Sequence, residues 1–248
     1  MLKSLNLLLL PFRLLLIAFA TALSGIIFIP SVLLIGKKRS FKYTQIPLIW
    51  GTTLCFAAGV RLRVTGKENV PKDRGVVFVF SHASFLDIPI VFAAVRGYFN
   101  FAAKSYVFKI PFIGQVGRVM KTIEIKKNLE DSIKEYKRAE VMVQEGESFM
   151  IAPEGTRSDT EDINPFKSGP FLFAMGARAD IVPVVIYGAS KIWSNKQIVP
   201  NLSSFGGIVH VHLMPPVKIS EFNNENRKDK AEQIRQEMIN ELDRMKSL

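Results

Sequence analysis

The chain has 248 residues, of which 48% are hydrophobic, and its 33 basic and 22 acidic side chains give a net charge of +11. It holds one cysteine, Cys55, which excludes an intrachain disulfide and a cysteine-based zinc cluster. Cys55 lies in an apolar run, where we expect a small buried hydrophobic residue.

The positive charge is concentrated in the amino-terminal half. The first 60 residues contain no acidic side chain, and the first 118 carry a net +12, whereas the remaining 130 carry −1. Such a one-sided field suits anionic lipid headgroups. Nucleic acid is the competing explanation for an isoelectric point near 9.8. The chain has no recognised nucleic-acid-binding motif, however, and its basic end is also its apolar end, so we expect a membrane as partner and no nucleic acid.

Two uncharged runs, residues 14–36 and 43–60, are long enough to be considered for spanning a bilayer. A cleaved signal peptide does not fit, because the first run is long and a second follows it. A two-span hairpin would place the basic connector on the side opposite a cytosolic domain, against the charge bias of short loops. We therefore expect residues 1–60 to form a membrane-anchoring helical pair, monotopic on the cytosolic face of a cell or inner membrane.

The remaining residues, 61–248, are predicted to form one domain in which short β-rich runs alternate with helices. Helical spacing is clearest in residues 129–147 and in the tail, residues 224–248, which is expected to cover the sheet. The alternation predicts an α/β layered fold, a mostly parallel sheet flanked by helices, with functional groups at strand ends. The predicted strands are Val76–Phe80, Asn100–Ala103, Thr122–Lys126, Ser148–Ile151, Ile181–Tyr187 and Val209–Leu213.

The run SHASFLD, directly after the first of these strands, holds His82 and Asp87. On a continuous helix five residues rotate by about 500°, so the two side chains would lie roughly 140° apart and could meet only if the segment turns. Ser81 and Ser84 are good turn residues. A carboxylate on one ring nitrogen raises the basicity of the other, which can then take a proton from an alcohol. The alternative is a surface histidine beside a helix cap.

A second polar run, EGTRS, follows the predicted strand Ser148–Ile151. Arg157 offers a planar fork for a phosphate, Thr156 a hydroxyl, and Gly155 a position where backbone can approach an anion closely. The run therefore reads as an anion-binding loop. The alternative is a charged turn in which Glu154 and Arg157, three residues apart, pair with each other.

Four blocks in this order resemble the glycerolipid acyltransferase family, and within it the 1-acyl-glycerol-3-phosphate (lysophosphatidate) acyltransferases. The resemblance covers nearly all of the chain from Arg61 onward, and it implies a fold like that of glycerol-3-phosphate acyltransferase. The blocks are His82 with Asp87; Lys104 with Ile110, Pro111, Phe112 and residues 114–123; Glu154 to Ser158 with Pro165, Phe166, Lys167 and Gly169; and Ile181 to Val184.

The chain departs from the family pattern at three positions. Ser81 stands where members usually carry asparagine, and it can still donate a hydrogen bond. Lys121 and Lys127 stand where members tend to have glycine and arginine. Lysine keeps the positive charge of arginine but lacks its planar fork.

The resemblance implies transfer of a fatty acyl chain from acyl-CoA or an acyl carrier protein to the sn-2 hydroxyl of lysophosphatidate, giving phosphatidate. His82, oriented by Asp87, would act as general base without an acyl-enzyme and without a cofactor. Glu154 would position the glycerol backbone. The acceptor phosphate would be bound by Arg157, Lys104, Lys127, Thr156 and the backbone around Gly155.

Two other functions stay open from the sequence. The nearer is an acyltransferase for glycerol 3-phosphate or another lysophospholipid, and the more distant is a non-catalytic protein that binds anionic lipid. A metal site is not expected. His210 and His212 share one face of a predicted strand, but no carboxylate or cysteine lies near them in the sequence.

Overall fold

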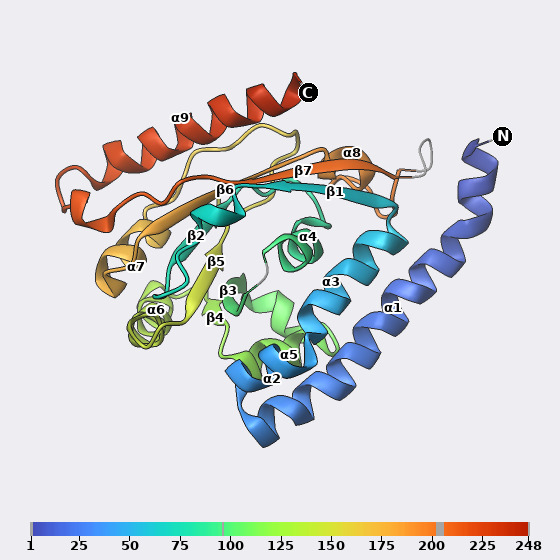
Figure 1. Ribbon diagram of the computed structural model, residues 1–248, viewed down its shortest axis with the longest axis horizontal. Helices are drawn as coiled ribbons and strands as arrows, with labels where there is room; N and C mark the ends of the chain where they lie inside the picture. The colour runs from blue at the N-terminus through green and yellow to red at the C-terminus, as the bar shows by residue number, and fades with distance from the viewer. Residues whose placement is uncertain (1, 96, 202–205, 248) are drawn as a thin grey trace.

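The computed structural model describes residues 2–95, 97–201 and 206–247 (Figure 1). Within these residues a seven-stranded sheet has the order β1-β7-β6-β2-β5-β3-β4. Among the described strands, neighbours are parallel except for the antiparallel pair β6 and β7. The predicted mostly parallel α/β sheet is confirmed. The strands are β1 Val60–Thr65, β2 Val77–Phe80, β3 Phe99–Lys104, β4 Ile123–Ile125, β5 Ser148–Ile151, β6 Ile181–Tyr187 and β7 Gly207–Leu213.

Helices cover both faces of the sheet (Figure 1). In β2, Val77 and Val79 face the core under α6, α7 and α9, whereas Phe78 and Phe80 face α4 and α8. Burial on both faces explains why the central strands read as continuous apolar runs. The helices after β1 are α4 Asp87–Ala94, α5 Ile113–Met120, α6 Leu129–Gln144, α7 Gly169–Ala177, α8 Ala189–Ile192 and α9 Arg227–Lys246, with 3₁₀ turns η1 Lys67–Asn69, η2 Ser105–Lys109 and η3 Ile219–Glu221.

The carboxyl-terminal helix α9 packs on the sheet as its sequence predicts. Its apolar side chains recur every three or four residues, and the helix buries this stripe while its charged side chains face solvent. The prediction for the tail is confirmed, with the buried positions Ala231, Ile234, Met238, Leu242 and Met245.

The sequence analysis did not predict β1. In this strand Val60, Leu62 and Val64 pack against the core, while Arg61 and Arg63 alternate with them. The strand lies at the sheet edge and pairs with β7 along its whole length. The alternation of apolar and basic residues in VRLRVT is typical of a strand with one buried face, so the signal was present in the sequence and was missed.

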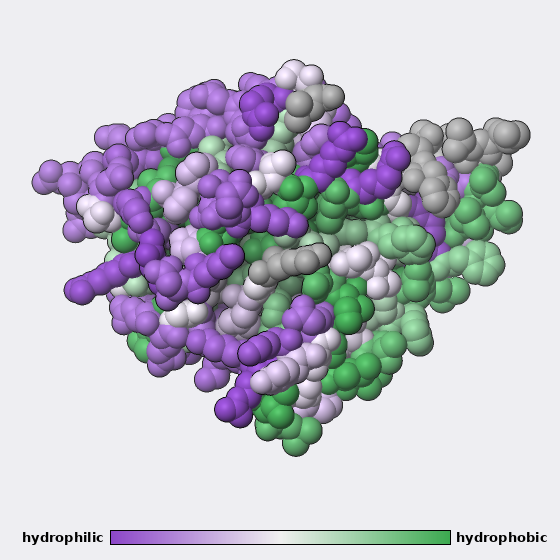
Figure 2. Space-filling model, in the orientation of Figure 1, coloured by the Kyte–Doolittle hydropathy of each residue, from purple (hydrophilic) through white to green (hydrophobic). Residues whose placement is uncertain are grey.

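Three helices precede β1 where a pair was expected: α1 Leu2–Ile35, α2 Lys37–Thr44 and α3 Ile46–Ala57. The basic connector between the two apolar runs is itself helical, which corrects the predicted pair. Within the described residues, the segment 5–35 of α1 is long and apolar enough to cross a membrane by length and composition. Figure 2 shows apolar residues gathered over the side formed by α1 and α3, away from the polar surface of α9.

The three amino-terminal helices are fixed to the sheet by polar contacts. Lys37 Nζ lies 2.7 Å from an Oε2 of Glu147, a carboxylate that is 3% exposed and also accepts from Tyr98 and Asn100. In α1, Arg13 Nε donates to the Ala57 carbonyl at the end of α3 at 2.7 Å. The three amino-terminal helices therefore pack against the rest of the domain. The predicted division of the chain at residue 60 stays a prediction.

Candidate active site

The two predicted motifs meet at the carboxyl ends of neighbouring parallel strands. β2 pairs with β5 so that Val79 lies opposite Ile151, and each strand runs directly into its motif. The backbone N–H of His82 donates to Glu154 Oε1 at 2.9 Å, and the N–H of Ser158 donates to the His82 carbonyl at 2.7 Å. The parallel sheet thus joins segments that are about seventy residues apart in the sequence.

His82 and Asp87 are in contact, with Nδ1 and Oδ2 separated by 2.7 Å. The segment turns before α4, as the spacing of the two residues requires. Asp87 Oδ2 also accepts from the backbone N–H groups of Ala83 and Ser84, each at 2.8 Å, and Asp87 is 1% exposed. Three donors on one buried oxygen hold the carboxylate in place. With Nδ1 directed at Asp87, Nε2 of His82 is the nitrogen left to accept a proton.

Glu154 supports the backbone of His82. Its Oε1 accepts from His82 and its Oε2 accepts from the N–H of Asn164, both at 2.9 Å. The Glu154 side chain is 3% exposed and is not among the residues that line the cavity beside His82. Both oxygens are therefore occupied by main chain, a geometry that suits a brace for the histidine loop. Burial raises the pKa of Glu154 to about 7.

Replacement of Glu154 by glutamine is expected to change how stability depends on pH. The carboxyl group binds its proton more tightly in the folded protein, with a pKa of about 7, than at its ordinary value of 4.5. The folded protein therefore loses stability as the pH rises between these two values, and the non-titrating variant does not. Thermal unfolding of both proteins from about pH 5 to about pH 8 measures this difference. A constant difference across that range would contradict the prediction.

Arg157 lies over the ring of Phe85, with its guanidinium carbon 3.9 Å from the ring centroid. Among the described residues none accepts a hydrogen bond from this guanidinium or forms an ion pair with it. The alternative in which Glu154 and Arg157 pair with each other is therefore not found. Phe85 was missed by the sequence analysis, although an aromatic residue three positions after His82 was visible there. The site presents a cation whose N–H groups are free to bind an anion.

The loop around Gly155 depends on glycine. Gly155 has φ +73°, and a Cβ atom there would lie 2.8 Å from Cε of Lys167. The left-handed conformation favours glycine here, whereas the Lys167 side chain could move away from a Cβ atom. Gly155, Thr156 and Arg157 all line the cavity that His82 lines.

The two predicted lysines differ in position. Lys104, at the end of β3, is exposed and lines the cavity. Lys127 is exposed between β4 and α6 and is not among the residues that line it, so its predicted phosphate contact has no geometric support. Lys121, where the family tends to have glycine, ends α5 with φ +61°, a conformation that glycine adopts without strain.

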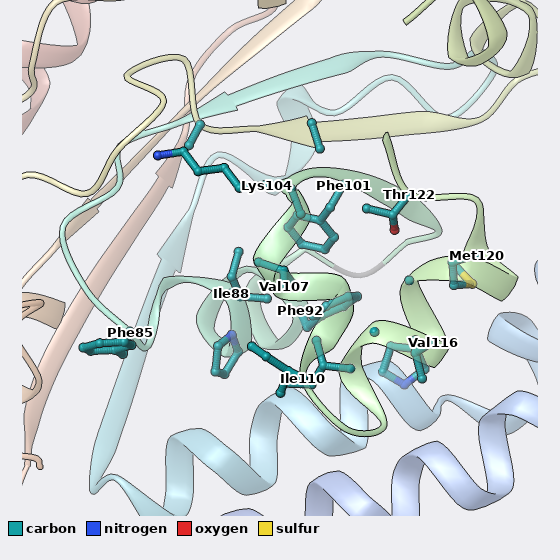
Figure 3. Close-up of a pocket in the computed structure, with 18 of the residues that line it drawn as sticks. Phe85, Ile88, Phe92, Phe101, Lys104, Val107, Ile110, Val116, Met120 and Thr122 are labelled. Atoms are coloured by element: carbon teal, nitrogen blue, oxygen red, sulfur yellow. The ribbon is translucent and has the colours of Figure 1, made fainter. Parts of the chain in front are cut away.

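A cavity of about 750 Å³ extends from the motifs to the amino-terminal helices. Figure 3 shows Lys104 and Phe85 at one side of this cavity and Val116 and Met120 at the other. Its lining is mostly apolar. Of the three amino-terminal helices, α1 and α3 contribute to it and α2 does not. The lining includes Thr21, Gly25 and Phe28 of α1, Trp50 and Leu54 of α3, Phe92 of α4, Phe101 of β3, and Val116, Gly117 and Met120 of α5.

No group of three or more His, Cys, Asp or Glu side chains that could hold a metal ion lies within the described ranges. His212 instead contacts Thr65, with 2.7 Å between Nδ1 and Oγ1. Cys55 is buried, which raises the pKa of its thiol to about 12, so the thiol is a core group and not a nucleophile.

The chain matches the family model described as Acyltransferase over residues 61–187. It is 32% identical over 194 residues to the 1-acyl-sn-glycerol-3-phosphate acyltransferase of Borreliella burgdorferi (strain ATCC 35210 / DSM 4680 / CIP 102532 / B31), covering 76% of this chain and 74% of that protein. It is 32% identical to a chloroplastic 1-acyl-sn-glycerol-3-phosphate acyltransferase of Brassica napus, over 66% of this chain but 47% of that longer protein.

A solved structure has the same fold. The 1-acyl-sn-glycerophosphate acyltransferase PlsC from Thermotoga maritima superposes with a TM-score of 0.83, over 98% of each chain and at 24% sequence identity. The match extends over the amino-terminal helices as well as the sheet, because it covers nearly the whole chain. Sequence and fold agree: the chain belongs to the acyltransferase family and is an enzyme similar in sequence to 1-acyl-sn-glycerol-3-phosphate acyltransferases.

Proposed function

We propose that this acyltransferase moves a fatty acyl chain from an acyl thioester to the sn-2 hydroxyl of lysophosphatidate, giving phosphatidate. The observation that carries the proposal is one cavity lined by a histidine that contacts Asp87, by a half-buried arginine with no anionic partner among the described residues, and by a long apolar wall. These three features match a hydroxyl, a phosphate and an acyl chain respectively.

In the proposed reaction Nε2 of His82 takes the proton of the acceptor hydroxyl as its oxygen attacks the thioester carbonyl. The carbon–sulfur bond then breaks, and the histidine returns the proton to the leaving thiolate. Asp87, fixed by three donors, stabilises the imidazolium formed between these steps. The proposed reaction needs no acyl-enzyme, and Ser81 is a poor nucleophile because it is 5% exposed and its Oγ accepts from the backbone N–H of Ile186 at 2.9 Å.

The acceptor phosphate is assigned to Arg157, with Thr156 and Lys104 beside it in the cavity. The Phe85 ring holds the face of the guanidinium at 3.9 Å and leaves its edge for hydrogen bonds. A phosphomonoester accepts from two N–H groups of such an edge at once. This geometry supports an acceptor that carries a phosphate.

The acyl chain of the donor is assigned to the apolar part of the cavity, so residues on its wall should affect chain length. Gly117 lines this wall, and a Cβ there would lie 3.3 Å from the Phe108 ring, a contact that a small adjustment accommodates. We expect Gly117→Leu to lower the rate with long-chain donors and to spare short-chain donors, because each methylene left in water costs about 0.8 kcal/mol. Competition between donors of different length measures this, and an unchanged preference would contradict it.

The protein is proposed to be monotopic on the cytosolic face of a cell or inner membrane. One side of α1 packs on the domain, with Phe28 and Val32 buried, while its other side exposes apolar residues such as Leu8, Phe12 and Phe19. A helix that forms part of a cavity wall has only one face left for lipid, which suits insertion along one leaflet better than a span. The acceptor would then reach the cavity without leaving the bilayer.

The proposal is tested by thiol release from acyl-CoA, and from acyl carrier protein as second donor, by detergent-solubilised protein with and without lysophosphatidate. Acceptor-dependent release that yields phosphatidate supports it. Release that is faster with glycerol 3-phosphate or with a lysophospholipid lacking a phosphomonoester would replace the acceptor. Binding to anionic liposomes without release from any donor and acceptor would favour the non-catalytic lipid-binding function.

A further inference from the structure

The segment that follows β6, residues 188–196, contacts both the loop that holds His82 and the loop that holds Arg157. Gly188 N donates to Glu161 Oε1 at 2.8 Å on one side. Ser84 Oγ, in the histidine loop, donates to the Trp193 carbonyl at 2.6 Å, and the rings of Trp193 and Phe85 are 5.7 Å apart. This segment therefore holds the loop from which Phe85 supports Arg157.

Asn195 joins the same segment to the arginine loop. Its Nδ2 lies 3.0 Å from the Ser158 carbonyl, 3.1 Å from Oδ1 of Asp159 and 3.5 Å from the Arg157 carbonyl. Asn195 also lines the cavity beside Arg157. This amide has two N–H groups, and its shortest contacts join the segment to the Ser158 carbonyl and the Asp159 carboxylate of the anion-binding loop.

The other end of the Asn195 amide argues for function over packing. Its Oδ1 is buried and accepts no hydrogen bond from any residue that the structure describes. A buried acceptor without a donor destabilises the folded state. A buried acceptor without a donor is expected where a residue serves the functional site at some expense of stability.

We infer that Asn195 is a positioning residue for Arg157. Its amide sets the main chain at Arg157 and Ser158, while Trp193 supports the Phe85 ring on which the guanidinium lies. The segment 188–196 thereby joins the loop that holds Arg157 to the loop that holds His82. The inference rests on the proposed function, in which Arg157 binds the acceptor phosphate.

The test compares Asn195→Ala with wild type in the thiol-release assay and in thermal unfolding. We expect the KM for lysophosphatidate to rise about tenfold, kcat to change less than about threefold, and the melting temperature to stay within about 3 °C. Asn201→Ala is the matched control, because Asn201 donates its amide to the Lys191 carbonyl in the same segment and does not line the cavity. If the alanine variant does not fold, Asn195→Leu, which is close in size, uncharged and lacks the donor, replaces it.

A double-mutant cycle shows whether Asn195 acts through Arg157. In an Arg157→Lys background the planar fork is gone, so we expect Asn195→Ala to change kcat/KM by less than about twofold. A full tenfold effect in that background, or an equal fall in kcat in the single variant, would overturn the inference. Wild-type turnover with lysophosphatidate tests the proposed function separately. The positioning role of Asn195 is tested only by the comparison of variants.

Discussion

Replacement of His82 by alanine is expected to lower kcat by about 10² to 10⁴ while leaving the KM values for both substrates nearly unchanged. In the proposed reaction the imidazole Nε2 accepts the proton, and the 2.7 Å contact between Nδ1 and Asp87 orients the ring. Its loss removes an interaction made in the transition state and leaves substrate binding in place. Initial rates of thiol release at varied concentrations of acceptor measure both constants.

His210→Ala is the matched control for this prediction. His210 lies on β7, with its ring 6.3 Å from that of Tyr187, and is not among the residues that line the cavity, so its variant should keep the wild-type rate. Asp87→Asn should lower kcat as well, because a neutral amide cannot stabilise the imidazolium that forms on His82. A His82→Ala enzyme with near-normal kcat would rule out the general-base assignment.

Replacement of Arg157 by alanine is expected to lower kcat/KM for lysophosphatidate by about tenfold to 150-fold, mostly through KM. Hydrogen bonds to charged groups contribute about 1.5 to 3 kcal/mol each, and no described residue competes with the phosphate for this guanidinium. The variant should retain its melting temperature, because the side chain makes no ion pair within the described part of the protein. Kinetics with lysophosphatidate measure the loss.

The two parts of the arginine contribution can be separated. Arg157→Lys keeps the charge but loses the fork and the stack on Phe85, so its kcat/KM should fall between those of wild type and the alanine variant. Lys127→Ala serves as comparison, since this lysine lies outside the cavity lining and its removal should have the smaller effect. Equal losses for acceptors with and without a phosphate would contradict the assignment of Arg157.

The central strands could be read from the sequence because their residues are buried on both faces. The predicted strand Ser148–Ile151 coincides with β5, and Ile181–Tyr187 coincides with β6. The amphipathic period of α9 was equally clear. By contrast β1 was missed although its alternation of apolar residues with Arg61 and Arg63 is typical of a half-buried strand, and α2 was missed because its four basic residues read as a connector. Their conformations depend on contacts with β7 and with Glu147.

The candidate site was predicted in its chemistry more than in its geometry. His82 with Asp87 and the Arg157 loop were evident because each motif follows a strand, and strand ends in a parallel sheet converge. The resemblance implied that Glu154 positions the glycerol backbone, and this stays a prediction. Its contacts with the main-chain N–H groups of His82 and Asn164 were not evident from spacing. No signal in the sequence pointed to Asn195, which reaches the site through a loop about forty residues further along.

The sequence by itself indicated the fold class, the histidine–carboxylate pair and a loop suited to bind an anion, because these depend on local order: a buried strand followed directly by polar residues. The tertiary structure alone decided which side chains share the cavity, that the wall consists of α1, α3 and α5, and that Arg157 is held by Phe85 and the Asn195 segment. The physical reason is that these contacts join segments far apart in the chain. Their partners are fixed by packing against the sheet, which no local pattern of residues encodes.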